Sequence, residues 1–137
     1  MKKIILMILL LGGIAYGSEG MNLEKCPDSP NCVITDKSDK KHYIEPISFK
    51  SANLMLVNKK LVDILKELGG DVVENNGEYI KVVFSTKVFK FKDIAEFKIS
   101  LKDQKIYLRS AAQSGWYDFG VNRKRIEKIR ELMREGK

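Results

Sequence analysis

Residues 79–112 read YIKVVFSTKVFKFKDIAEFKISLKDQKIYLRSAA and carry most of the information about the fold class. Apolar and polar side chains alternate in three segments, at residues 79–86, 96–101 and 106–112. A period of two is typical of strands that bury one face. Asp103-Gln104 supplies a turn, and residues 87–93 form either a bent strand or a connection. The stretch therefore predicts an antiparallel meander.

A helix and a hairpin are predicted directly before this stretch. Ser51 or Asn53 can cap the helix, and Gly69 can end it. A short strand at residues 71–74 and the turn Asn75-Asn76-Gly77 follow. The apolar positions of the predicted helix have the spacing of one helical face. They are Leu54, Val57, Leu61, Ile64, Leu65 and Leu68.

A second amphipathic helix is predicted at the end of the chain, with Ile126, Ile129, Leu132 and Met133 on one face. Asp118 or Asn122 can cap it, and Gly120 eases the chain into it. Residues 44–49 add a short strand that Pro46 confines to an edge. These elements predict a two-layer α+β fold, in which an antiparallel sheet of about four to five strands carries two packed helices.

The length of 137 residues fits one domain, which we place at residues 44–137. It excludes a protein kinase, a barrel enzyme or a complete dinucleotide-binding fold. The DFG string at Asp118 lacks every other kinase motif, and no metalloprotease, nucleophile-elbow or phosphate-loop pattern occurs.

The first 17 residues have the composition of a signal peptide. Lys2 and Lys3 precede an uncharged apolar run, residues 4–16, which is too short to span a bilayer comfortably. Ala15 and Gly17 predict cleavage after Gly17, and the alternative is an uncleaved anchor. The exported chain would carry 23 basic and 18 acidic side chains. We expect it in the periplasm or cell envelope, with residues 18–43 forming an extended arm.

Two cysteines lie in this arm, within CPDSPNC. Export favours a structural disulfide between Cys26 and Cys32, since the intervening residues favour turns. A redox C-x-x-C motif is absent, and a zinc site that recruits His42 lacks an evident fourth ligand. His42 itself is expected to be solvated in its charged loop. We therefore predict no metal and no cofactor.

The candidate binding residues lie between the last strand and the last helix. They are Arg109, Ser110, Asp118, Asn122 and Arg123. Arginines and helix N–H groups at such a corner can hold an anion. The alternative is structural: Asp118 caps the helix and pairs with an arginine, while Trp116 packs at the sheet edge.

Two segments resemble the signatures of an uncharacterised bacterial family catalogued as domain of unknown function 1499. The first matches at Cys26, Pro27, Ser29, Pro30, Asn31, Cys32 and Val33. The second matches at Arg109, Ser110, Ala111, Gly115, Asp118, Gly120, Asn122, Arg123, Arg125 and Ile126. The chain departs from the family pattern at Ile34, Thr35, Ala112 and Gln113. The resemblance implies no activity, substrate or catalytic residue.

These observations favour a small exported binding or structural module with a basic strand-to-helix corner. Its expected partner is an anionic envelope component or another protein, with association at a membrane surface, because the chain is basic. The alternative is a hydrolase-like enzyme that uses Asp118 with Arg109 and Asn122. A nucleic-acid partner is disfavoured for two reasons. An exported protein leaves the compartment that holds nucleic acid, and acidic residues are interspersed among the basic ones.

Overall fold

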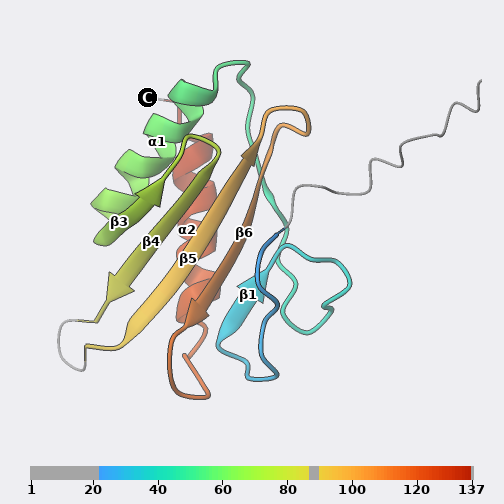
Figure 1. The fold of residues 1–137 in the computed structure, drawn as a ribbon, viewed down its shortest axis with the longest axis vertical. Helices are drawn as coiled ribbons and strands as arrows, with labels where there is room; N and C mark the ends of the chain where they lie inside the picture. Colours follow the sequence, from blue (N-terminus) through green and yellow to red (C-terminus); the bar gives the residue numbers. More distant parts are fainter. Residues whose placement is uncertain (1–21, 87–89, 137) are drawn as a thin grey trace, which may run out of the picture.

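The computed structural model describes residues 22–86 and 90–136 of the chain (Figure 1). The predicted signal peptide and its cleavage site lie outside these residues. The predicted α+β architecture is confirmed, and the described residues form six strands and two helices. In chain order these are β1 (Cys32–Ile34), β2 (Ile47–Ser48), α1 (Leu54–Glu67), β3 (Gly70–Asn75), β4 (Tyr79–Ser85), β5 (Lys92–Ser100), β6 (Lys105–Ala112) and α2 (Val121–Arg134).

The strands form one antiparallel sheet in the order β1-β6-β5-β4-β3. The predicted meander forms its body, and the Asn75-Asn76-Gly77 turn joins β3 to β4. Strand β1 pairs with the end of β6, where Cys32 lies opposite Ala111. Strand β2 pairs with the start of β6, where Ile47 lies opposite Ile106. Two segments of the N-terminal part therefore share one edge of the sheet.

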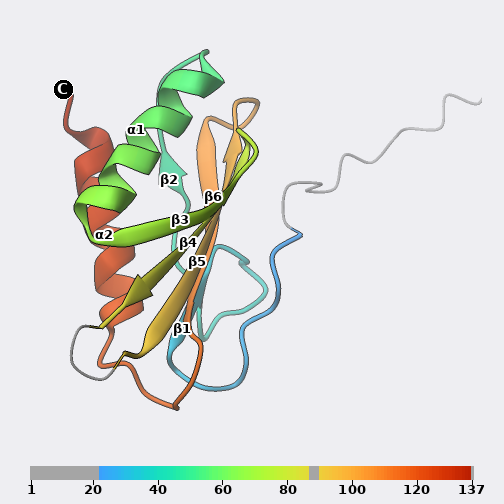
Figure 2. The same ribbon diagram turned by 60° about the vertical axis from the view of Figure 1, so that its left-hand side comes forward.

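Both helices cover the same face of the sheet (Figure 2). Alternate residues of the central strands point into this layer, so Ile80, Phe97 and Leu108 have no exposed surface. On the helix side of this layer, Leu61 of α1 and Ile126 of α2 are also fully buried. Burial of the two apolar helix faces against the sheet supplies most of the driving force for folding.

The strand β1 and the early start of β5 were not predicted. Strand β1 has three buried residues and no alternation. Strand β5 begins at Lys92, within the segment for which a bent strand or a connection was expected.

Asn53 caps α1, as predicted, by accepting a hydrogen bond from the Leu56 backbone N–H at 3.3 Å. Within residues 22–86 and 90–136, neither helix has the length and apolar character needed to cross a membrane.

Candidate functional site

The two sequence motifs meet in space, because β1 pairs with the end of β6. Asn31, which is buried, donates from Nδ2 to the carbonyl oxygen of Gly115 at 2.8 Å. Its own carbonyl accepts from the backbone N–H of Ala112 at 3.0 Å. The Ser29 hydroxyl donates to Asn31 Oδ1 at 2.8 Å and fixes the amide. The first motif therefore fastens the loop that leads from β6 to α2.

Ser110 and Asn122 form the centre of a buried polar network behind this loop. Neither residue has exposed surface. The Ser110 hydroxyl donates to Asn122 Oδ1 at 2.6 Å, and Arg125 Nη1 donates to the same oxygen at 3.2 Å. Asn122 Nδ2 donates to Asp118 Oδ2 at 2.9 Å. The amide thus links strand β6, the loop and helix α2.

Arg125 extends the network to β5. Its Nη2 donates to Asp93 Oδ2 at 3.0 Å, and both side chains are largely buried. Its guanidinium also lies over the ring of Phe84, 4.2 Å from the centroid, which favours the cation. A buried charge needs such partners, because burying a charge without a compensating partner lowers the stability of the fold. Neither Asp93 nor Arg125 was among the predicted site residues.

Asp118 holds the start of α2 from outside the helix. Its Oδ1 accepts from the Gly120 backbone N–H at 2.9 Å, and its Oδ2 accepts from the Asn122 backbone N–H at 3.1 Å. Burial would raise the pKa of Asp118, but the hydrogen bonds from Asn122 and Gly120 together outweigh burial and lower it. Asp118 thus binds backbone N–H groups of the first turn of α2, as predicted, although the N-cap position itself is occupied by Gly120. Among the described residues, no arginine donates to this carboxylate.

Replacing Asp118 with alanine is expected to lower the free energy of unfolding by about 1 kcal/mol at neutral pH, as the loss of a cap does. Because the folded-state pKa is depressed, this stabilisation exists above the ordinary aspartate pKa and disappears as pH falls through the lower folded value. Urea unfolding from neutral pH down to about pH 3 measures the difference in free energy of unfolding between the unmodified chain and the variant. This gap should close below about pH 4. A gap that stays constant with pH would contradict this role.

The two remaining predicted site residues lie apart from the network. Arg109 faces away from the helices, next to Ser110 in the strand, and its Nη2 donates to the Lys25 carbonyl at 3.3 Å. It lines a groove of about 470 Å³ with Pro27 and Ile94. Arg123 donates to the Tyr43 carbonyl at 3.0 Å. The five candidates therefore do not form one anion site.

The loop between β6 and α2 exposes three aromatic side chains, which we call the aromatic tip: Trp116, Tyr117 and Phe119. Their exposed fractions are 65%, 62% and 76%. The expectation that Trp116 packs at the sheet edge is wrong. The rings of Tyr117 and Phe119 contact each other edge to face, with centroids 4.9 Å apart. Phe119 also has a left-handed backbone, with φ of 56°.

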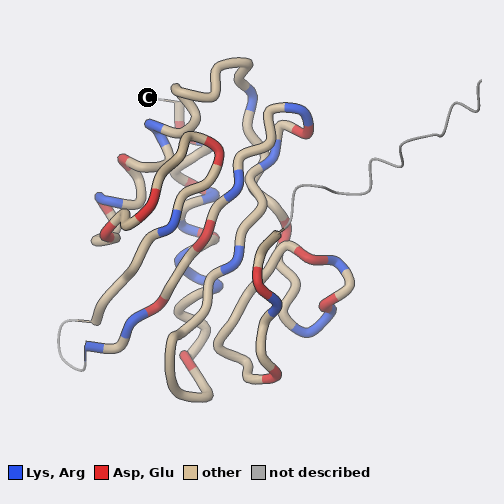
Figure 3. Tube along the Cα trace, viewed as in Figure 1, with Lys and Arg blue, Asp and Glu red and all other residues tan. Residues whose placement is uncertain are grey.

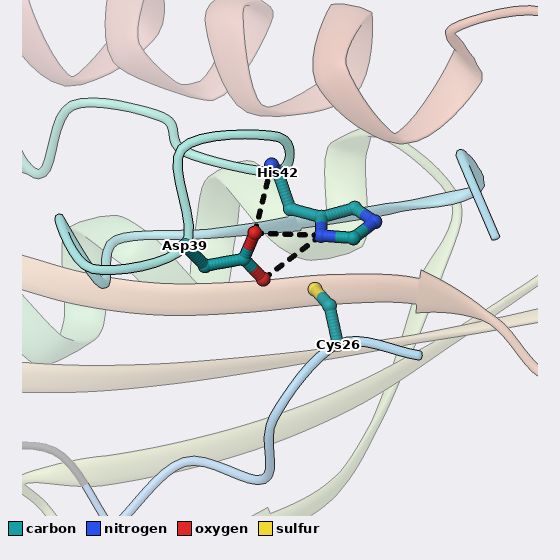
Figure 4. Close-up of side chains that lie close together, drawn as sticks. All are labelled: Cys26, Asp39 and His42. Atoms are coloured by element: carbon teal, nitrogen blue, oxygen red, sulfur yellow. Dashed lines mark hydrogen bonds and ion pairs between the residues drawn. The ribbon is translucent and has the colours of Figure 1, made fainter. Parts of the chain in front are cut away.

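A second cluster lies in the N-terminal part, where Cys26 and Cys32 form the predicted disulfide. The expectation of a solvated His42 is wrong, because only 4% of the residue is exposed. Its ring lies between two oxygen acceptors: Nε2 is 2.8 Å from the Ser29 carbonyl, and Nδ1 is 2.8 Å from the Asp39 carboxylate. Figure 4 shows Asp39 and His42 facing the sulfur of Cys26. These tertiary contacts, rather than the charged neighbours in sequence, set the environment of His42.

Comparison with known proteins places the chain in a family without assigning an activity. No curated protein and no solved structure matches it. A family model described as Protein of unknown function (DUF1499) matches residues 22–133. This range contains the disulfide loop, the buried network and the aromatic tip. The chain therefore belongs to the DUF1499 family.

Proposed function

We propose that this protein is an exported, non-catalytic binding module that docks its aromatic tip on an anionic membrane surface. The observation that carries the proposal is the exposure of Trp116, Tyr117 and Phe119 on one short loop. Clustered exposed apolar side chains mark interaction sites. Tryptophan and tyrosine in particular suit the membrane–water interface, since their rings are apolar and their tips are polar.

The conformation of Phe119 supports a role outside the folded core. A left-handed backbone is unfavourable for a residue with a bulky side chain. The side chain of Phe119 is 76% exposed, so packing within the protein does not repay this cost. The strained position instead projects the ring outward, next to Tyr117.

The network behind the loop would make the tip a rigid surface. Asp118 lies between Tyr117 and Phe119 in sequence and binds the start of α2. Asn31 holds the carbonyl of Gly115, directly before Trp116. Because both ends of the loop are fixed, the aromatic side chains lose little backbone freedom when they bind, which favours affinity.

The charge around the tip selects an anionic surface. Residues 90–92 belong to the same end of the sheet, because the Gln113 N–H donates to the Lys92 carbonyl at 2.8 Å. Across residues 90–92 and 113–124 the basic side chains are Lys90, Lys92, Arg123 and Lys124. The one acid in these two ranges is Asp118, which is engaged in the network. Figure 3 colours the basic and acidic residues along the described chain. Each basic side chain near an anionic leaflet contributes about 1 kcal/mol.

Export is supported by the apolar run at residues 4–16 and by the disulfide, which forms in oxidising compartments.

The hydrolase-like alternative has less support. The carboxylate of Asp118 accepts three hydrogen bonds from protein N–H groups, and Asn122 is fully buried. Arg109 has its hydrogen bond on the other side of the sheet.

Vesicle sedimentation tests this function. The chain from Ser18 onward contains every described residue and omits the apolar run, which would bind lipid by itself. It is expected to sediment with vesicles of phosphatidylglycerol and phosphatidylcholine, and to bind less as salt is raised, because salt screens the ionic attraction. Vesicles of phosphatidylcholine alone should bind it weakly. No sedimentation with the anionic vesicles would overturn the proposal and favour a protein partner for the tip.

A further inference from the structure

The disulfide loop packs against the side chains of Asp39 and His42, two residue types that bind metal ions in proteins. One ligand atom each from Cys26, Asp39 and His42 lies within 4.8 Å of the others. In Figure 4 the Cys26 sulfur and the Asp39 carboxylate both lie beside the imidazole ring. The Cys32 sulfur is bonded to that of Cys26 and so adjoins this group. Three donor groups thus converge, one sulfur, one imidazole nitrogen and one carboxylate, and a second sulfur lies next to them.

The orientation of His42 is the one that a metal ligand requires. Its Nε2 is 2.8 Å from the Ser29 carbonyl oxygen, and since that oxygen only accepts, Nε2 carries a proton. Histidines that bind metal through one nitrogen commonly donate the other N–H to a backbone carbonyl, which fixes the tautomer and the ring. Nδ1 is hydrogen-bonded to the Asp39 carboxylate beside Cys26, and a metal ion would take the place of the proton between them.

The contact between His42 and Asp39 requires only a small adjustment to admit a metal ion. Two nitrogen or oxygen ligands, each about 2.0 Å from a tetrahedral zinc ion, lie about 3.3 Å apart. The Nδ1 atom of His42 and the carboxylate of Asp39 are now 2.8 Å apart, in direct contact. Separation by roughly half an ångström would admit the ion. Asp39 is partly exposed, with 27% of its side-chain surface accessible, so solvent reaches the cluster from that side.

We propose that Cys26, Cys32, Asp39 and His42 form a Zn²⁺ site when the disulfide is reduced. A dithiol donor supplies two electrons and two protons, which break the S–S bond and give two thiols, while the donor becomes a disulfide. Zn²⁺ then displaces one proton from each thiol and the proton that lies between His42 Nδ1 and Asp39, all three passing to solvent, and binds both sulfurs, the His42 Nδ1 atom and one Asp39 oxygen. Thiolate, imidazole and carboxylate are the donors that zinc accepts in four-coordinate sites.

Disulfide and zinc are mutually exclusive in this scheme, because a sulfur in an S–S bond is not a thiolate ligand. The metal would replace the disulfide as the link between Cys26 and Cys32, and would also bind them to Asp39 and His42. The Lys41 ammonium group donates to the carbonyl of Asp28, within the cysteine loop. Its positive charge partly compensates the three negative groups that surround the ion.

Cobalt and zinc titrations of the full chain test the site. After reduction with a phosphine, Co²⁺ should give the intense visible bands of a tetrahedral thiolate complex, and Zn²⁺ should abolish them. The oxidised chain should give no such bands. Reduced chain that shows no thiolate–cobalt absorption would overturn the proposal, and this result needs no variant.

Two substitutions in the same loop then separate the site from adventitious thiol binding. His42→Ala is expected to weaken Zn²⁺ binding of the reduced chain at least about tenfold, since one of four ligands is lost. Asp36→Asn is the matched control and should leave affinity unchanged, because Asp36 binds Ser38 rather than the cluster. If His42→Ala does not fold, Asp39→Asn replaces it. Equal zinc affinity in the ligand variant and the control would also overturn the proposal.

Discussion

Replacing Trp116 and Phe119 with serine is expected to weaken binding to anionic vesicles by at least about tenfold. Each ring that enters the interface buries on the order of 100 Å² of apolar surface, worth roughly 2.5 kcal/mol. A loss of about 1.4 kcal/mol already corresponds to a factor of ten. Sedimentation across a range of lipid concentrations measures the change. Because both side chains are largely exposed, the melting temperature should hardly move.

The matched control replaces Met55 and Leu56 with serine. These apolar residues are 80% and 62% exposed, and they lie at the start of α1, at the opposite end of the molecule from the aromatic tip (Figure 1). The control should bind vesicles like the unmodified chain. Equal loss of binding in both double variants would show that general hydrophobicity, rather than the tip, drives association.

Replacing Asn122 with alanine is expected to lower the free energy of unfolding by about 3 kcal/mol, because it breaks a buried hydrogen-bond network. The substitution leaves the Ser110 hydroxyl without its acceptor and removes a partner from Asp118 and from Arg125. Urea unfolding at neutral pH measures the loss. The aromatic tip should then be held less firmly, so vesicle binding should fall in the same variant.

Asn58→Ala provides a comparison on the other helix. Asn58 is partly exposed and donates to Asn75 and to the Gly77 carbonyl. Its loss should cost only about 1 kcal/mol, the usual net value of an accessible hydrogen bond. If Asn122→Ala costs no more than Asn58→Ala, the network does not hold the corner as we infer.

The sheet and helices were largely predictable because their signals are local. The alternation in residues 79–86 and 106–112 and the helical spacing after Asn53 each come from burial of one face. Strand β1 could not be found in this way. Its three residues are all buried, and its partner in β6 is distant in sequence, so neither periodicity nor a nearby turn marks it.

The site was predicted in its parts but not in its arrangement. Ser110 shares the phase of Ile106 and Leu108 in the strand, a signal that it points into the core, whereas Arg109 is out of phase and points to the other face. Asp93 has the same phase as Ala95 and would have been recognised once β5 was extended to Lys92. The burial of His42 depends on contacts with Ser29 and Asp39 that only the folded chain supplies.

The most direct measurement uses Trp116, which is the chain's only tryptophan. Its side chain is mostly in water in the free protein, so its fluorescence reports the environment of the tip without a label. Titration with anionic vesicles is expected to shift the emission maximum to shorter wavelength and to protect the indole from an aqueous quencher, as transfer to the interface requires. Emission and quenching that stay unchanged while the protein sediments with the vesicles would show that another surface binds, and would contradict the role of the aromatic tip.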